Sequence, residues 1–237
     1  MSRVTIRESG LFPEALEELL RAMGDADFFE DGILVGSWVF VLYGSIYGVE
    51  YPIRTFDVDF AVPPVLDPTR SSFDLEKIIT SRGYLPITER SGWRKYTREG
   101  FGVEFITNRR GSRDGVDVIK PLNITALRLP FLDLLFESPI TVDLPNIKLR
   151  IPSPESLFLH KLITSQRRIE TTKAEKDLEQ CRYLAKVIDF SKVTELLQKR
   201  HWSRESRKRL MAACEKIGLS CEKVWGVGDR SSVKSSG

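Results

Sequence analysis

The sequence lacks long hydrophobic runs and contains little cysteine or histidine. Among its 237 residues are 3 Cys and 2 His, and no apolar run approaches the ~20 residues that a membrane-spanning helix needs. Residues 1–10 have none of the apolar centre that marks a signal peptide. We therefore expect a soluble, cytoplasmic protein with no membrane contact.

The three cysteines, Cys181, Cys214 and Cys221, are odd in number and do not show the paired CxxC spacing of zinc sites or redox motifs. We expect them to be reduced thiols. The net charge of +3 is too small to imply polyanion binding by bulk charge alone. Nucleic-acid contacts would have to come from local patches such as residues 199–209, although a solvated helix face is the commoner explanation of such a stretch.

Hydrophobic periodicity and turn residues divide the chain into an α/β half and a helical half. In the first half they predict helices over 11–24, with Pro13 at its first position and Gly24 as its end, 38–47 and 71–82, and strands over 33–35, 57–62, 93–98, 101–107 and 147–151. Ser71 and Asp74 have the spacing of a capping box. After a hinge at 152–154, three helices are expected over roughly 155–168, 173–188 and 191–211. We thus predict an α+β fold with domains at 1–151 and 152–225, followed by a disordered tail at 226–237.

Two carboxylates stand on the predicted strand 57–62. Side chains alternate along a strand, so Asp57 and Asp59 share one face while Phe56, Val58 and Phe60 share the apolar face. Two carboxylates about 4 Å apart repel by ~4 kcal/mol at an effective dielectric constant near 20, so a cation is needed if both stay ionised. Magnesium is the natural candidate, because it prefers oxygen ligands and binds through one or two carboxylates plus substrate phosphates.

Two further features favour a phosphate and metal site. The strand 101–107 carries Glu104 on its polar face, which offers a third carboxylate. Gly36 and Ser37 lie between a short strand and a helix, and helix N-termini bind phosphate well. Alternation alone favours an ordinary half-exposed strand with a solvated face, so the interpretation depends on the combination of parts.

This order of parts resembles the DNA polymerase β-like nucleotidyltransferase superfamily. The resemblance rests on Val35-Gly36-Ser37, then Asp57-Val58-Asp59, then Glu104. It looks most like the bacterial branch that is related to toxin-type nucleotidyltransferases, because Arg54 and Thr55 precede the acids and nineteen residues separate Ser37 from Asp57. The segments 152–168 and 173–180 are similar to the helical half of that group, where a Lys and a later Lys-Asp recur.

The resemblance implies a fold and a set of roles. The fold would be a small mixed sheet flanked by helices, followed by a helical domain. Asp57, Asp59 and Glu104 would be the catalytic and metal-binding residues, with two magnesium ions, or manganese in their place. The nucleotide would be bound by residues before the acids and in the helical half, namely Gly36, Ser37, Arg54, Thr55, Lys161 and Asp177.

The residues leave several alternatives open. Lys161 would reach a nucleotide phosphate or pair with Asp177, and Asp177 fits equally a surface pair with Lys173. Arg109, Arg110 and Arg113 would line the acceptor side of the pocket. We expect transfer of a nucleotide from an NTP to a hydroxyl of RNA, a protein or a small molecule. One alternative is a metal-dependent nuclease, for which a Lys beside Glu104 would be expected but is not found next to it in the sequence. The other is a catalytically degenerate binding protein or antitoxin.

Overall fold

The structure, a computed structural model, describes residues 2–66, 73–109, 111 and 114–225. The chain forms two compact units, Met1–Ser153 and Pro154–Gly237, which we call the first and the second unit. In the described part of the chain, no helix has the length and apolar character needed to cross a membrane.

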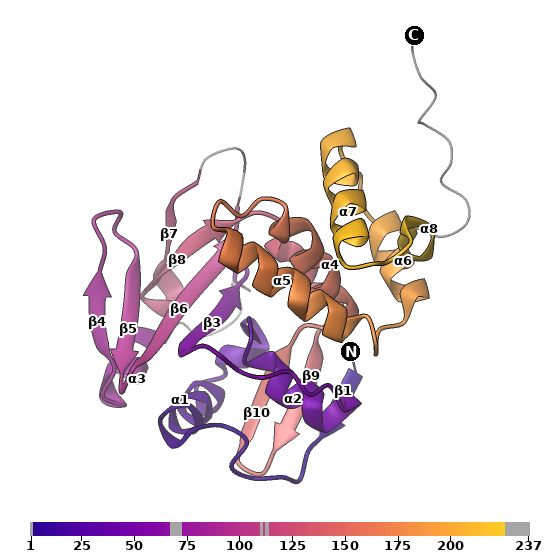
Figure 1. The fold of residues 1–237 in the computed structure, drawn as a ribbon. Coiled ribbons are helices and arrows are strands. Elements are labelled where there is room, and N and C mark those ends of the chain that lie inside the picture. The colour runs from indigo at the N-terminus through magenta and orange to yellow at the C-terminus, as the bar shows by residue number, and fades with distance from the viewer. Residues whose placement is uncertain (1, 67–72, 110, 112–113, 226–237) are drawn as a thin grey trace. The chain divides into compact units, whose positions relative to one another are not determined.

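The first unit is built on a mixed sheet in the order β2–β3–β6–β5–β4 (Figure 1). These strands are β2 (Ile33–Val35), β3 (Asp57–Val62), β4 (Leu85–Thr88), β5 (Arg94–Arg98) and β6 (Phe101–Asn108). The central pair β3–β6 is parallel, whereas β2 runs antiparallel to β3 and β5 antiparallel to β6. The C-terminal half of β6 pairs with β8 (Ile124–Leu129), which in turn pairs with β7 (Val116–Ile119).

Helices and a smaller sheet complete the first unit. The smaller sheet has the order β1–β9–β10, with β1 (Ser2–Thr5), β9 (Ile140–Leu144) and β10 (Ile147–Ile151). Helix α1 (Glu14–Asp25) packs on β10. The remaining helices are α2 (Val39–Tyr47), α3 (Leu75–Ser81) and the short 3-10 segments η1 (Phe28–Glu30), η2 (Lys120–Leu122) and η3 (Leu132–Phe136).

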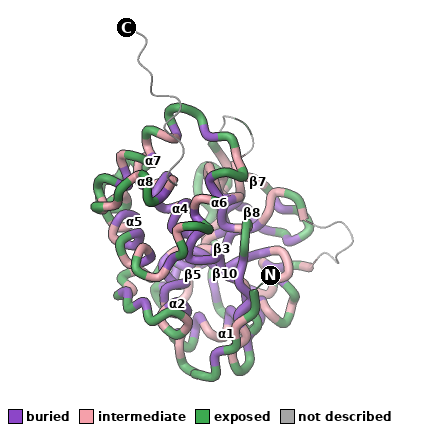
Figure 2. Tube along the Cα trace, turned by 90° about the vertical axis from the view of Figure 1, so that its right-hand side faces the viewer, coloured by how far each residue is buried: buried purple, intermediate pink, exposed green. Residues whose placement is uncertain are grey.

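The apolar face of the central strands explains why they form the core. Phe60 of β3 and Phe105 of β6 stack with ring centroids 5.7 Å apart, and Phe28 of η1 packs edge-on against both. All three rings are buried, and β3 runs through the buried, purple part of the tube in Figure 2. Phe56 departs from the prediction that it anchors this face, because it precedes the strand and its side chain is 65% exposed.

The second unit is helical, as predicted. It contains α4 (Pro154–Ser165), α5 (Thr171–Leu184), α6 (Phe190–Gln198), α7 (Arg204–Lys216) and the short α8 (Cys221–Trp225). The prediction of a single helix over 191–211 is wrong, since α6 ends at Gln198 and a separate helix, α7, begins at Arg204. Buried Trp202 donates its indole N–H to the Leu197 carbonyl at 2.8 Å, and Ser203 caps α7 by accepting from the Ser206 N–H at 3.1 Å.

The predicted α+β class is confirmed, with the smaller errors at helix ends and in short strands. Pro13 is the N-cap of α1 and not its first residue, and the helix continues through Gly24 to Asp25. Helix α3 begins after its own cap, Asp74, whose carboxylate accepts the Lys77 N–H; Ser71 lies outside the described residues, as do residues 226–237 of the predicted tail. The prediction missed β1, β4 and β7 and gave no bounds for β8 and β9. The three cysteines are free thiols.

Candidate active site

The acids predicted to share a site stand on neighbouring strands. In the register of the sheet, Asp59 of β3 lies between Val35 of β2 and Glu104 of β6. Asp57, two residues earlier on the same strand, lies opposite Gly102. Asp57 is exposed, and Asp59 and Glu104 are partly exposed, whereas Val58 between the two aspartates is fully buried. The sheet thus holds three carboxylates at its solvent-facing surface on an apolar anchor.

Gly36 brings the end of β2 against Asp59. Its φ of +76° lies in the left-handed region, and a Cβ built there would stand 2.5 Å from Oδ2 of Asp59. A side chain at this position would therefore collide with the carboxylate. Ser37, which follows, is buried, and its carbonyl accepts the Phe40 N–H at 3.1 Å as α2 begins. The turn at Gly36 therefore lies directly against the Asp59 carboxylate, and α2 begins three residues later, at Val39.

Lys95 of β5 is a site residue that the sequence analysis missed. Its Nζ lies 2.6 Å from Oε1 of Glu104 and 2.9 Å from Oδ1 of Asp57, so one ammonium bridges two of the three acids. Burial by itself lowers the pKa of Lys95, but the hydrogen bonds to Glu104 and Asp57 outweigh it, and the pKa is raised. The bridging group is therefore a charged ammonium at neutral pH.

Gly102 provides the space in which Lys95 lies. A Cβ at position 102 would stand 2.3 Å from Cε and 2.8 Å from Nζ of Lys95, and 3.0 Å from Oδ1 of Asp57. Any other residue there would push the lysine off the acids. The absence of a side chain at Gly102 is thus what lets the ammonium reach across β6 to β3.

The oxygens of Asp57, Asp59 and Glu104 are of the kind that magnesium prefers, but their arrangement limits how they could bind an ion. The ammonium between Asp57 and Glu104 shows that this surface accommodates a cation. Within the described residues, however, no group of three His, Cys, Asp or Glu side chains is arranged to hold one metal ion. Magnesium ordinarily needs only one or two carboxylates and takes its remaining ligands from water and substrate phosphates. The acids therefore fit an ion that is completed by a phosphate ligand, not an all-protein cage.

The segment before β3 contributes Thr55 to the local structure. Its hydroxyl accepts the Asp57 N–H at 3.1 Å, which fixes how the chain enters the strand. Arg54 is exposed. Their nucleotide-binding role stays a prediction.

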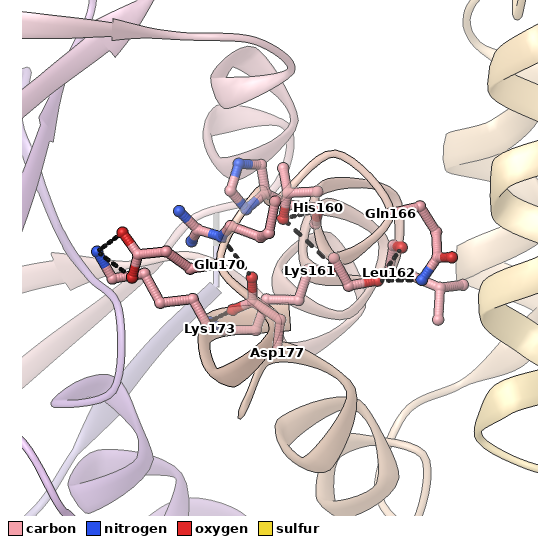
Figure 3. A network of polar contacts seen from close by, with 10 residues as sticks. His160, Lys161, Leu162, Gln166, Glu170, Lys173 and Asp177 are labelled. Carbon is pink, nitrogen blue, oxygen red and sulfur yellow. Dashed lines mark hydrogen bonds and ion pairs between the residues drawn. The ribbon is translucent and has the colours of Figure 1, made fainter. Parts of the chain in front are cut away.

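In the second unit, Lys161 and Asp177 bond to each other. Nζ of Lys161 lies 3.0 Å from Oδ1 of Asp177, and both point toward one another in Figure 3. Nε of Arg168 lies 3.0 Å from the second carboxylate oxygen. Only 9% of the Lys161 side chain and 6% of that of Asp177 is exposed. Of the two partners that the sequence left open for Lys161, the structure shows Asp177; Lys173 pairs with Glu170 instead.

Both carboxylate oxygens of Asp177 are bonded within this buried network, one by Lys161 and one by Arg168. Burial raises the pKa of Asp177, but the charges and hydrogen bonds of Lys161 and Arg168 prevail, and its pKa is lowered. His160, beside Lys161, has a buried Nε2 with no hydrogen-bond partner among the described residues. Burial, followed by the Lys161 charge, lowers the pKa of His160 to about 3. The imidazole is therefore neutral at physiological pH.

The predicted basic patches are largely paired or outside the described residues. Arg109 bonds Asp114 at 2.7 Å, while Arg110 and Arg113 lie outside the described residues. In the stretch 199–209, Arg200 lies over the Trp202 ring and Arg209 bonds Glu205.

Comparisons with known proteins show the family and the fold of the chain. A family model described as nucleotidyltransferase matches residues 14–205, and the chain belongs to that family. It is similar in fold to the crystal structure of an antigenic nucleotidyltransferase-like protein from Paracoccidioides brasiliensis, with a TM-score of 0.50 and 14% identity, over 93% of this chain and 98% of that chain. No curated protein sequence matches the chain.

Proposed function

We propose that the protein transfers a nucleotide from an NTP to an acceptor hydroxyl in a magnesium-dependent reaction. The observation that carries this proposal is the register that sets Asp59 between the Gly36 turn and Glu104. Membership of the nucleotidyltransferase family supports the reaction class. The same register would serve the reaction because a triphosphate at the turn would lie within reach of the acids.

Each residue has a distinct task in this proposal. Asp57 and Asp59 would hold magnesium, which when bound would neutralise the triphosphate and favour departure of pyrophosphate. The backbone around Gly36 and Ser37 would bind the β- and γ-phosphates through N–H groups at the start of α2. Arg54 and Thr55 would contact the nucleotide from the segment before β3.

The reaction is an in-line displacement at the α-phosphorus. The acceptor oxygen forms a bond to that phosphorus, the bond to the bridging oxygen of the β-phosphate breaks, and pyrophosphate leaves. The hydroxyl proton goes to a base, and we assign that task to Glu104, whose carboxylate is partly exposed beside Asp59. The acceptor would be RNA, a protein side chain or a small molecule.

The test is transfer of label from each α-labelled NTP in magnesium, with and without total RNA and cell lysate. We expect label in an acceptor and release of pyrophosphate, both abolished in Asp57→Ala and Asp59→Ala. Glu14→Ala, a change on the first turn of α1, serves as the matched carboxylate control and should keep full transfer. Binding of NTP that persists in both aspartate variants, with no transfer to any acceptor, would contradict the proposal.

A metal-dependent nuclease is the second candidate, and one observation favours it. The sequence alone offered no lysine beside Glu104, but the structure puts Lys95 at 2.6 Å from it. Acids and a lysine together also serve phosphodiester hydrolysis. The same assay separates the two, because a nuclease would cleave the RNA without NTP and would release no pyrophosphate.

A further inference from the structure

The position of Lys95 bears on how many metal ions the site takes up. Its ammonium, on β5, forms two short ion pairs, one to Glu104 on the neighbouring strand β6 and one to Asp57 on β3, beyond β6. A metal ion bound through the same two oxygens, Oδ1 of Asp57 and Oε1 of Glu104, would need to occupy the same place. The ammonium and such an ion are therefore mutually exclusive.

The arrangement is built into the sheet and is not a chance surface contact. The antiparallel register pairs Tyr96 with Val103, so Lys95 stands opposite Glu104 one step along. The notch at Gly102 then directs its stem toward Asp57. Only 27% of the Lys95 side chain and 17% of that of Glu104 is exposed, which shields this pair from solvent more than an ordinary surface pair.

Asp59 is placed differently from the other two acids. Lys95 contacts Asp57 through Oδ1 and Glu104 through Oε1, while Asp59 faces the Gly36 turn with one oxygen. The side of the site that faces the turn is thus the side where a cation and a triphosphate would meet. The side that faces β5 already holds a positive charge.

We propose that Lys95 is a resident cation that takes the place of one of the two magnesium ions expected for this site. The protein would then take up a single magnesium ion together with the triphosphate, held by Asp59 and by the Asp57 oxygen that Lys95 does not contact, while Lys95 keeps Asp57 and Glu104 together. This inference rests on the proposed function for the identity of the nucleotide. The competition between lysine and metal does not depend on catalysis.

The experiment counts bound Mn²⁺ by electron paramagnetic resonance, with metal alone and with a non-hydrolysable NTP analogue. We expect one ion per chain in the wild type with the analogue and two in Lys95→Met. With metal alone, Lys95→Met should bind Mn²⁺ at least about ten-fold more tightly, because the competing charge is gone. Lys95→Arg keeps the charge and should bind Mn²⁺ as weakly as the wild type. Lys148→Met removes an exposed lysine paired with Glu30, and its Mn²⁺ affinity should match that of the wild type.

A thermal melt guards against loss of the fold in the variant. If the inference holds, Lys95→Met melts lower than the wild type without metal and recovers on addition of Mn²⁺, and Lys95→Gln behaves likewise. Equal Mn²⁺ affinity and stoichiometry in the wild type and both neutral variants would overturn it. Two ions in the wild type would overturn it as well. Absence of nucleotide transfer, with the metal-alone difference intact, would overturn only the proposed function.

Discussion

Two lysine–carboxylate networks in this protein use the same chemical groups in opposite surroundings. In the first unit, Lys95 bridges Asp57 and Glu104, and 57% of the Asp57 side chain is exposed. In the second unit, Lys161 and Arg168 enclose Asp177, of which 6% is exposed. The first network has carboxylate oxygens open to a ligand, whereas in the second both carboxylate oxygens are bonded.

The difference shows that pairing by itself does not identify a site. A buried pair must keep every charge satisfied, because an unpaired buried charge is costly. An exposed pair adds little to stability, since water and salt screen it. The first network, in which Asp57 stays exposed, therefore keeps a carboxylate accessible to a ligand, while the buried one stabilises the fold. Four changes test this contrast, beginning with the largest expected effect.

The first change is Asp177→Asn. It leaves the Lys161 ammonium buried without its carboxylate, so we expect the free energy of unfolding to fall by about 3–5 kcal/mol. Chemical denaturation of the wild type and the variant measures it. Glu170→Gln, which breaks the exposed pair with Lys173, is the matched control and should change the value by less than about 1 kcal/mol. Equal effects of the two changes would remove the contrast.

The second change concerns pH and the buried histidine. The pKa of His160 falls from 6.5 to about 3 on folding, so below pH 6.5 the unfolded chain takes up a proton that the folded chain does not. Stability from this group is therefore full above pH 6.5 and declines as the pH falls toward 3. Between pH 7 and 5 the loss is about 2 kcal/mol.

His160→Gln should remove that share of the pH dependence, and denaturation curves at several pH values measure it. His201→Gln is the control, because His201 is the other histidine of the chain and is exposed. A wild-type pH slope that persists in His160→Gln would show that the imidazole is protonated in the folded protein.

The third change is Gly36→Ala, with Gly48→Ala as its match. Both glycines have positive φ, +76° and +71°, so each alanine costs about 1–2 kcal/mol in backbone strain. At Gly48 a Cβ would meet nothing within 4 Å, whereas at Gly36 it would meet the Asp59 carboxylate. We expect only Gly36→Ala to weaken magnesium-dependent NTP binding, as measured by calorimetry. Loss of binding in both variants would point to strain and not to Asp59.

The fourth change, Asp57→Asn, should affect stability least. Its partner Lys95 keeps Glu104, and the side chain is exposed, so we expect a loss of less than about 1 kcal/mol. Nucleotide transfer should nonetheless be abolished. A loss as large as that of Asp177→Asn, seen in the same denaturation experiment, would place Asp57 in a structural role.

Much of the sheet followed from the sequence because alternation and turns are local. Strand β3 begins and ends where predicted, at Asp57 and Val62, since the acids alternate with apolar residues at its start and the apolar run that follows stops at Pro63. Strand β1 was missed because residues 2–5 are mostly exposed and pair with β9, more than 130 positions later in the chain. A pairing at such a distance leaves no local pattern.

The three acids were predicted to lie together, and the structure puts them on neighbouring strands, whereas the lysine beside them was missed. The predicted strands 93–98 and 101–107 leave only Glu99 and Gly100 between them, and both residues have the positive φ of a two-residue turn. Counting outward from that turn pairs Arg98 with Phe101 and hence Lys95 with Glu104, so the signal for Lys95 was present. The pairing of Lys161 with Asp177 needed the packing of α4 on α5, which spacing along one helix does not reveal.

The central claim is that Asp57, Asp59 and Glu104, and Asp59 above all, form the site for magnesium and nucleotide. It is tested most directly by calorimetric titration of NTP into the wild type and into Asp59→Asn, each with and without magnesium. We expect binding in the wild type only when magnesium is present, and none in Asp59→Asn under either condition. Equal NTP binding by the two proteins, or binding by the wild type that is unchanged when magnesium is removed, would contradict the claim.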